Sequence, residues 1–325
     1  MRLLKLVPDN TNIDFLRWRV PFYAISVLLM AASLALVFTR GLNLGVDFIG
    51  GQMIRASFPE GREAPVTSLR REVSALGYGE PSLQRYGRIN EVSIRMKLPE
   101  GADRDPALSD TMARKITAAI RQAHPEARID GVDSVSGKVS SELYRTGLTA
   151  LIAAMIAISI YIWIRFEWQF GVGALFALAH DVTLTLGMFA LTQMEFDLNI
   201  VAALLTLIGY SLNDTIVVYD RIRENLRKYR RMPLPELLNL SVNETLSRTV
   251  VTSLSLLITL VALLLLGPPV LFGFTAAITL GIFVGTYSSI YMAAPILIWL
   301  NVTSKSFVPG EGGVDRQERL AREVG

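Results

Sequence analysis

The sequence predicts an α-helical polytopic membrane protein with six transmembrane helices and one external ferredoxin-like α+β domain of element order β-α-β-β-α-β. Six long apolar runs predict the helices, and a long polar stretch between the first two runs predicts the domain. The composition agrees, because 51% of the 325 residues are hydrophobic and the mean hydropathy is +0.39. The chain has no cysteine, which excludes disulfides, thiolate metal sites and cysteine nucleophiles.

The N-terminal segment is basic and leads directly into the first apolar run. We expect residues 1–20 to be cytosolic and residues 21–38 to form transmembrane helix 1. A basic start followed by an apolar run is also typical of a signal peptide. The run is long, however, and no convincing small-residue cleavage site comes before Gly41, so the sequence favours a retained helix.

A glycine-rich segment, Gly45–Gly51, separates the first run from the polar stretch. Its three glycines in seven residues suit a tight, non-helical exit from the membrane. The segment is either an ordinary turn into a strand or a hinge that carries the external domain, and glycine spacing alone does not separate the two. We assign Asp47, Gly50 and Gly51 to a candidate hinge.

Residues 39–143 are predicted to form the external domain together with this hinge. Apolar residues alternate with polar ones around Ile54 and again around Ile94, which is the period of half-buried strands. Helical spacing follows each of two prolines, and a final strand falls near Arg128–Val135. The succession of elements predicts the ferredoxin-like order, and the nearly balanced charges argue against a nucleic-acid surface.

Five further apolar runs follow the external domain. We expect transmembrane helices 2–4 within residues 144–219, a basic cytosolic loop at 220–247, helices 5 and 6 within 248–300, and a cytosolic tail at 301–325.

Charge placement predicts the orientation of these spans. The loop at 220–247 holds six basic residues, whereas the short connections near 193–197 and 267–270 hold none. Basic short loops stay in the cytosol, so both termini are expected inside and the external domain outside. Within the basic loop, Ser241 followed three residues later by Glu244 fits a capping box and predicts a helix start before the fifth span.

A carboxylate lies inside the fourth apolar run. Asp214 precedes the first evident membrane exit by six residues, which is roughly 9 Å inside the hydrocarbon edge. An acid at that depth is a functional hypothesis by default, and a structural ion pair is the alternative. Arg248, in the antiparallel neighbouring span, is its expected cationic partner, with Asn213 and Thr252 nearby. A cation favours the ionised form and desolvation favours the neutral form, so such a group can exchange a proton as its surroundings move.

A second polar pair, His180 and Asp181, lies near the middle of the third run. Adjacent helical residues point about 100° apart, so we expect each to find a partner across the bundle and not to contact the other. Asp181 is the rival candidate for the proton site, while His180 fits an interhelical hydrogen-bonding role. Ser211 adds a further polar group on the fourth run. Asp214 ranks above Asp181 because it has a cationic partner and a denser polar surround.

The chain contains four distinctive segments, which are Gly45-Val46-Asp47-Phe48-Ile49-Gly50-Gly51, His180-Asp181, Ser211 to Asn225, and Ser247-Arg248-Thr249. Together they resemble the signature segments of SecF proteins, which belong to the SecD/SecF family of protein-export membrane proteins and to the resistance–nodulation–division superfamily. The resemblance covers essentially the whole chain, and its fourth-span segment is long and highly specific.

The resemblance implies a role in exporting unfolded preproteins across the bacterial inner membrane, with the proton gradient as energy source and no cofactor. It implies that Asp214, Arg248 and Thr252 line the proton path, to which we add the neighbouring Asn213. It also implies SecD as a six-span partner half, with the SecYEG channel, YajC and YidC as further partners. Six spans and one external domain also resemble half of a pseudo-symmetric twelve-span transporter, which independently predicts an obligate partner.

Two other function classes stay open. The first is a half-transporter of the same superfamily that exports a small molecule or a lipid. The second is a non-conducting assembly subunit that stabilises a channel without moving protons. An enzyme is not expected, because the sequence shows neither a phosphate-binding glycine loop followed by lysine nor a nucleophile–base constellation. Two histidines also leave little material for a metal site.

Overall fold

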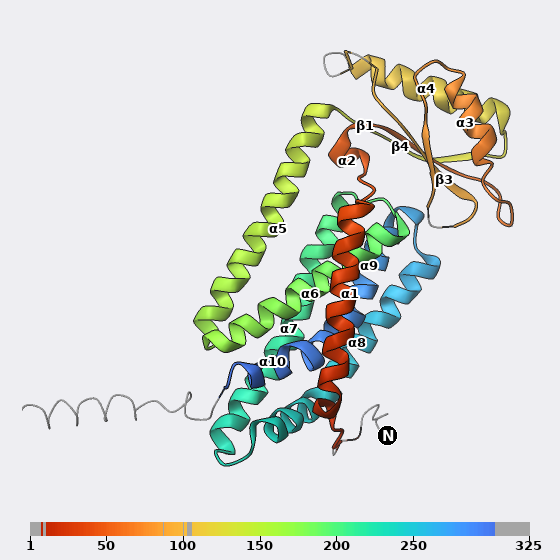
Figure 1. Cartoon of the computed structure of the whole chain (residues 1–325). Coiled ribbons are helices and arrows are strands. Elements are labelled where there is room, and N and C mark those ends of the chain that lie inside the picture. Colours follow the sequence, from red (N-terminus) through yellow and green to blue (C-terminus); the bar gives the residue numbers. More distant parts are fainter. Residues whose placement is uncertain (1–7, 9–10, 87, 100, 103–105, 303–325) are drawn as a thin grey trace, which may run out of the picture.

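The computed structural model describes residues 8, 11–86, 88–99, 101–102 and 106–302, with a small α+β domain at one end of a helical bundle (Figure 1). Within this described part, six helices are long and apolar enough to cross a membrane, which confirms the predicted number of spans. Their bounds are Phe15–Thr39, Gly137–Arg165, Trp168–Thr192, Leu198–Lys228, Leu234–Leu266 and Phe272–Trp299.

Three helices form the centre of the bundle, namely α6 (Trp168–Thr192), α7 (Leu198–Lys228) and α9 (Phe272–Ser288). Glycine lets two of them approach closely, because a Cβ atom added at Gly281 of α9 would overlap the side chain of Leu207 of α7. Small residues serve this purpose in membranes, where helices associate through close packing and not through exclusion of water.

The outer helices are α1 (Arg19–Thr39), which follows a 3₁₀ turn at Phe15–Trp18, α5 (Gly137–Arg165) and α8 (Leu234–Leu266). Helix α5 leans away from the central helices in Figure 1. One of its faces is exposed and apolar at every fourth residue, at Leu148, Ile152, Ile156, Ile160 and Ile164. This spacing places the five side chains on one stripe of the helix.

The sixth span is not one regular helix. Helix α9 ends at Ser288, a π-helical segment covers Ser289–Ala293, and α10 (Ala294–Trp299) completes the span. Pro295, in the first turn of α10, has no backbone N–H to donate, which accounts for the interruption of the ladder. Segments of π-helix inside a span are frequent at functional sites.

Helix α8 is continuous from Leu234, so the helix start predicted at Ser241 is wrong. The Ser241 hydroxyl donates to the carbonyl of Leu237 at 2.8 Å, and Glu244 accepts from Arg221 at 2.7 Å. Both side chains therefore form other hydrogen bonds, and neither caps a helix N-terminus. The basic segment at 220–247 is almost wholly helical, and only residues 229–233 connect α7 to α8.

The external domain follows the short helix α2 (Val46–Ile49), so the prediction that the glycine-rich segment is non-helical is wrong for these four residues. Its elements are β1 (Gly51–Ser57), α3 (Val66–Ser74), β2 (Ser82–Arg85), β3 (Glu91–Met96), α4 (Pro106–Ala123) and β4 (Arg128–Val135). The strands form one sheet of order β2-β3-β1-β4, in which every neighbouring pair is antiparallel. Figure 1 shows α3 and α4 on the face of the sheet that points away from the bundle.

Alternation along the strands gives the sheet two different faces. Ile54 and Ile94 lie opposite each other in the β1–β3 pairing and pack with Met112 of α4 in the core of the domain. Arg55 and Arg95, one residue further along each strand, point to the other face. The face turned toward the bundle is therefore polar.

The candidate hinge requires glycine at both of its final positions. Gly50 and Gly51 have φ values of 70° and 128°, which side chains with a Cβ atom rarely adopt. A Cβ atom at Gly51 would also come within 2.6 Å of the carbonyl oxygen of Met96, on the neighbouring strand. The start of β1 is thus held against β3 by close backbone contact.

We expect Gly51→Ala to destabilise the external domain by about 1–3 kcal/mol, because it combines backbone strain with this overlap. Gly61→Ala is the matched control, since Gly61 also has a positive φ of 82° but has no atom within 4 Å of an added Cβ. Thermal unfolding of the purified full chain measures both variants. A shift that is equal for the two would show that the contact with Met96 does not matter.

Candidate functional site

Asp214 lies in the middle of α7 (Leu198–Lys228), within the apolar part of this helix, and only 3% of its surface is exposed. Among the described residues, its Oδ2 atom is buried and has no hydrogen-bond partner. Leaving a buried acceptor unsatisfied is unfavourable, and more so when the group is charged. The structure therefore places the predicted acid where a change of charge has a large energetic effect.

Arg248 lies on the exposed side of α8 and attracts Asp214 electrostatically without forming a direct ion pair within the described part of the chain. Asn213 and Thr252 are exposed as well. The Thr252 hydroxyl donates to the carbonyls of Arg248 and Thr249 of its own helix, each at 3.0 Å. The four predicted proton-path residues thus lie on α7 and α8, and three of them face outward from the bundle.

A buried hydroxyl on α8 adds to this site. Thr249 is 2% exposed, and its Oγ1 atom has no partner among the described residues. The sequence places it directly after Arg248, but nothing in the sequence separates it from the other hydroxyl residues of that span. It supplies a second unsatisfied polar atom on the helix that faces Asp214.

Hydroxyl groups connect α7 with α8 and the sixth span. Tyr210 hydrogen-bonds Ser253 at 3.1 Å, and Ser253 in turn hydrogen-bonds Thr286 at 2.8 Å. Thr215, next to the acid, hydrogen-bonds Ser289 in the π-helical segment at 3.0 Å. A hydroxyl both donates and accepts, so such contacts can change direction when a neighbouring group changes its protonation.

Asp181 has a different environment from Asp214. It is fully buried, and its Oδ2 atom accepts hydrogen bonds from Ser211 at 2.5 Å and from Ser288 at 2.9 Å. Its Oδ1 atom lies 2.9 Å from Nδ1 of His180, so the prediction that these adjacent residues do not contact each other is wrong. Helical spacing fixes the directions of the Cβ atoms, and the side-chain torsions of His180 bring the two groups together. Both oxygens of the Asp181 carboxylate have hydrogen-bond partners, whereas Oδ2 of Asp214 has none among the described residues.

The third hinge residue, Asp47, connects the external domain to α7. Its Oδ2 atom accepts a hydrogen bond from the backbone N–H of Leu198 at 3.0 Å. Asp197 is the N-cap of the same helix and accepts from the N–H of Ile200 at 3.1 Å. Both acids satisfy amides that have no partner inside the helix. The candidate hinge is therefore hydrogen-bonded to the N-terminus of the helix that carries Asp214.

Two loops at the end of the bundle next to the α+β domain pair with each other. The N–H of Gly45 donates to the carbonyl of Phe196 at 2.9 Å, and the N–H of Phe196 donates to the carbonyl of Asn43 at 2.8 Å. The loop after α1 and the loop between α6 and α7 thereby form one platform beneath the sheet.

The polar face of the sheet binds this platform. Arg95 of β3 donates to the carbonyl of Leu44 and to Oδ1 of Asn43, both at 2.6 Å. Gln84 of β2 accepts from Asn43 and donates to the carbonyl of Gln193. We call these contacts the seat of the external domain. Sequence reasoning missed the seat, because its residues come from segments far apart in the chain.

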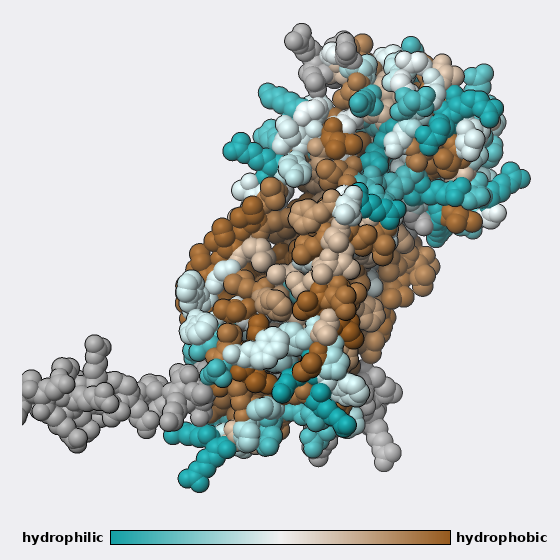
Figure 2. All heavy atoms as spheres, viewed as in Figure 1, coloured by the Kyte–Doolittle hydropathy of each residue, from teal (hydrophilic) through white to brown (hydrophobic). Residues whose placement is uncertain are grey.

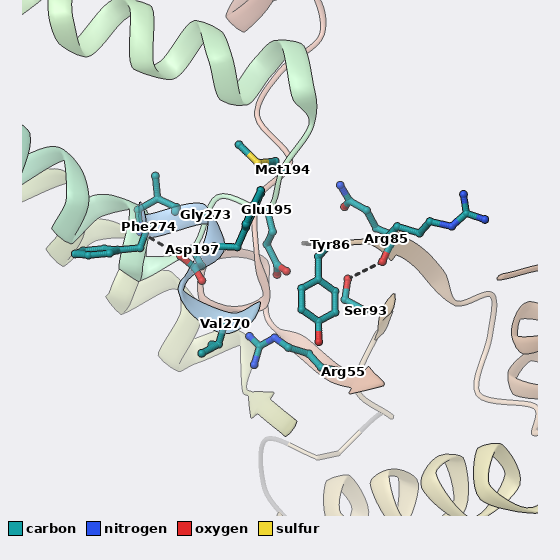
Figure 3. Close-up of a pocket in the computed structure, with 13 residues that line it drawn as sticks. Arg55, Arg85, Tyr86, Ser93, Met194, Glu195, Asp197, Val270, Gly273 and Phe274 are labelled. Carbon is teal, nitrogen blue, oxygen red and sulfur yellow. Dashed lines mark hydrogen bonds between the residues drawn. The ribbon is translucent and has the colours of Figure 1, made fainter. Parts of the chain in front are cut away.

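A cavity lies beside the seat, between the sheet and the bundle, and Glu195 points into it (Figure 3). Burial raises the pKa of Glu195, the guanidinium groups of Arg95 and Arg55 oppose this rise, and the carboxylates of Asp197 and Asp47 add to it. The Oε1 atom of Glu195 has no hydrogen-bond partner among the described residues. The other titratable groups that line this region are Arg85, Tyr86 and Asp133.

The raised pKa of Glu195 predicts that the seat is pH-dependent. A carboxyl whose pKa rises on docking holds its proton more tightly when docked, so docking is strongest in acid and weakens as the pH rises above the ordinary value of 4.5. Spin labels on cysteines at Ser82 and Leu191 measure the docked distance, since the chain has no native cysteine.

In Glu195→Gln this pH dependence should disappear, because the amide does not ionise. Glu142→Gln is the matched control, since Glu142 is exposed at the start of α5 and should leave the dependence intact. A pH dependence that persists in Glu195→Gln would assign it to another group of the cavity.

Six apolar spans, an acid buried in the fourth and an α+β domain seated at one end define a polytopic membrane protein of the transporter type. Residues 115–303 match the family model described as protein export membrane protein SecD/SecF, C-terminal. Residues 35–58, which include the hinge, match the SecD/SecF GG motif. The chain belongs to the SecD/SecF family.

Curated relatives match nearly the whole chain. It is 44% identical to the protein translocase subunit SecF of Rhodobacter capsulatus over 306 residues, which cover 92% of each chain. It is 46% identical to that of Cereibacter sphaeroides, over 92% of this chain and 93% of the relative. The relative from Calditerrivibrio nitroreducens is 42% identical, with 91% and 96% covered.

Solved structures agree with the fold. A SecDF from Thermus, described as a translocon-associated membrane protein, superimposes with a TM-score of 0.79 at 36% identity. The match covers 90% of this chain and 39% of the Thermus chain. A second SecDF structure, in a form called super-membrane-facing, gives a TM-score of 0.67 at 33% identity and covers 41% of that chain.

Proposed function

We propose that the chain acts as a SecF-type subunit of a bacterial protein translocase and uses the proton motive force to promote the passage of unfolded preproteins. Relatives named protein translocase subunit SecF, matched over 92% of their length or more, support the translocase role. The observation that carries the proton-driven part is Asp214, a buried carboxylate with an oxygen that has no partner among the described residues. The proposed energy source is the proton gradient, and the proposal requires no cofactor.

The geometry supports a simple mechanism. When Asp214 is ionised, Arg248 attracts it across α7 and α8. When Asp214 takes up a proton, that attraction is lost and the two helices are free to rearrange. Each elementary charge that crosses the full membrane field contributes about 2.3 kcal/mol per 100 mV. A few such transfers bias an equilibrium between two arrangements of the external domain.

The site needs a partner on its open side, and we propose that SecD supplies it. The exposed positions of α7 recur every three or four residues and carry small or polar side chains, at Ala202, Thr206, Gly209 and Asn213. Such a stripe favours close contact with another membrane helix. The match to 39% of the Thermus SecDF chain leaves room in that protein for the second half. We extend the proposal to the SecYEG channel, with YajC and YidC as accessory partners.

We further propose that the protein lies in the bacterial inner membrane with both termini in the cytosol and the external domain in the periplasm. The basic residues near the turn at 229–233 support this orientation, because basic short connections remain inside. In inverted membrane vesicles, an added protease should cleave at this turn and spare the external domain. Cleavage of the external domain alone would reverse the orientation.

The decisive variant is Asp214→Asn, which keeps the size of the side chain but cannot ionise. We expect it to insert, to bind its partner and to leave ATP-driven translocation intact. The gradient-dependent part of export should be lost, since each missing charge transfer removes about 2.3 kcal/mol at 100 mV, a bias of roughly 40-fold. Preprotein uptake into inverted vesicles, with and without an uncoupler, measures this part.

Asp220→Asn is the matched control, because Asp220 lies on the same helix and pairs with Arg165 at the surface at 2.8 Å. It should remain as sensitive to the uncoupler as the parent protein. Arg248→Met should resemble Asp214→Asn, since it removes the cation that the acid depends on. Full uncoupler sensitivity in Asp214→Asn would leave the chain as a non-conducting assembly subunit.

A further inference from the structure

An open cleft of about 500 Å³ lies at the end of the bundle opposite the external domain. It is formed where α5 ends against the extended end of α7. Its lining consists of charged residues, which are Arg165, Asp220, Arg223, Glu224, Arg227 and Lys228. None of them belongs to the proton site described above.

The two acids of the cleft are already occupied. Asp220 pairs with Arg165 at 2.8 Å, and Glu224 pairs with Arg221 at 2.6 Å. Within the described chain, the side chain of Arg227 forms neither a hydrogen bond nor an ion pair. Lys228 lies over the ring of Tyr229 at 4.9 Å and forms no ion pair with a described acid. The cleft therefore presents two cations, Arg227 and Lys228, that form no direct ion pair with a carboxylate of the described chain.

Arg223 lies deeper in the cleft and is held in place. It donates to the carbonyl of Arg165 at 3.2 Å and to Glu167 at 3.3 Å, and its guanidinium lies 5.1 Å from the ring of Phe166. Its Nε atom is buried and has no partner among the described residues. A fixed, planar guanidinium with a free N–H donor suits an oxyanion such as a phosphate, whose oxygens accept its hydrogen bonds.

Aromatic and apolar residues beside the cleft place it at the membrane surface. Trp163, Ile164 and Trp168 surround the corner between α5 and α6, and their exposures are 72%, 83% and 54%. Exposed tryptophan is typical of the level of the lipid headgroups. Figure 2 shows that hydrophilic residues begin at this end, next to the hydrophobic belt of the bundle.

We propose that this cleft binds the headgroup of an anionic phospholipid. Arg223, Arg227 and Lys228 hold the phosphate, and the acyl chains lie on the exposed apolar stripe of α5 that ends at Ile164. Basic pockets between membrane helices bind anionic headgroups in this way. The apolar stripe and the two tryptophans favour a lipid over a free phosphate, because only a lipid has acyl chains that pack against apolar side chains.

The test uses the full chain purified with the proteins that accompany it from the membrane. Binding of short-chain phosphatidylglycerol is titrated against phosphatidylcholine of the same chain length. The cleft variant is Arg227→Gln with Lys228→Gln, since both side chains are exposed and their loss leaves the packing intact. The matched control is Arg230→Gln with Arg231→Gln, which removes the same charge from the same region outside the cleft.

We expect the parent protein to prefer phosphatidylglycerol. The cleft variant should bind this lipid roughly 30-fold more weakly, because each of the two lost basic side chains accounts for about a fivefold change in affinity. The control variant should keep most of the preference. An equal loss in both variants would overturn the proposal in favour of diffuse surface charge. If inorganic phosphate competed as well as phosphatidylglycerol, the cleft would be a site for a free anion. If the cleft bound an acidic accompanying protein and not phosphatidylglycerol, it would be a protein contact. Both results contradict a lipid site.

Discussion

The structure is organised around the burial of one carboxylate, Asp214, in an apolar bundle where its Oδ2 atom has no partner in the described chain. A charge in that position is unfavourable. A direct ion pair would offset this energetic cost more completely than the observed arrangement, in which Arg248 makes no direct contact with Asp214. Asp181 shows the contrast, because one histidine and two serine hydroxyls satisfy its carboxylate. This difference between the two acids is the reason why we propose Asp214, and not Asp181, as the group that exchanges a proton.

Helix α7 joins this acid to the external domain. Its N-terminal amides are capped by Asp47 of the hinge and by Asp197, so a displacement of α7 moves the base of β1. The seat holds the polar face of the sheet on the same end of the bundle through Arg95 and its partners. The glycines at positions 50 and 51 adopt conformations that other residues rarely take, and they join α2 directly to β1. In the proposed mechanism, a change at Asp214 would reach the external domain through these hydrogen bonds.

The sequence predicted the six spans, the element order of the external domain and the place of Asp214 within the fourth span, because these follow from apolar runs and local periodicity. It failed where side-chain torsions or distant segments decide. The contact between His180 and Asp181 depends on rotamers that spacing does not determine. The capping pattern at Ser241 was overridden because the helix continues through it and gives the hydroxyl an acceptor at Leu237. The seat unites three segments that no local pattern connects.

The central claim is that Asp214 itself gains and loses a proton inside the membrane. Infrared difference spectroscopy of the reconstituted complex, as the outer side is made acidic, measures this directly through the carbonyl band of a protonated carboxyl group. We predict a band that is absent in Asp214→Asn and retained in Asp181→Asn. A band that persists in Asp214→Asn and disappears in Asp181→Asn would contradict the account and place the exchanging proton on the other carboxylate.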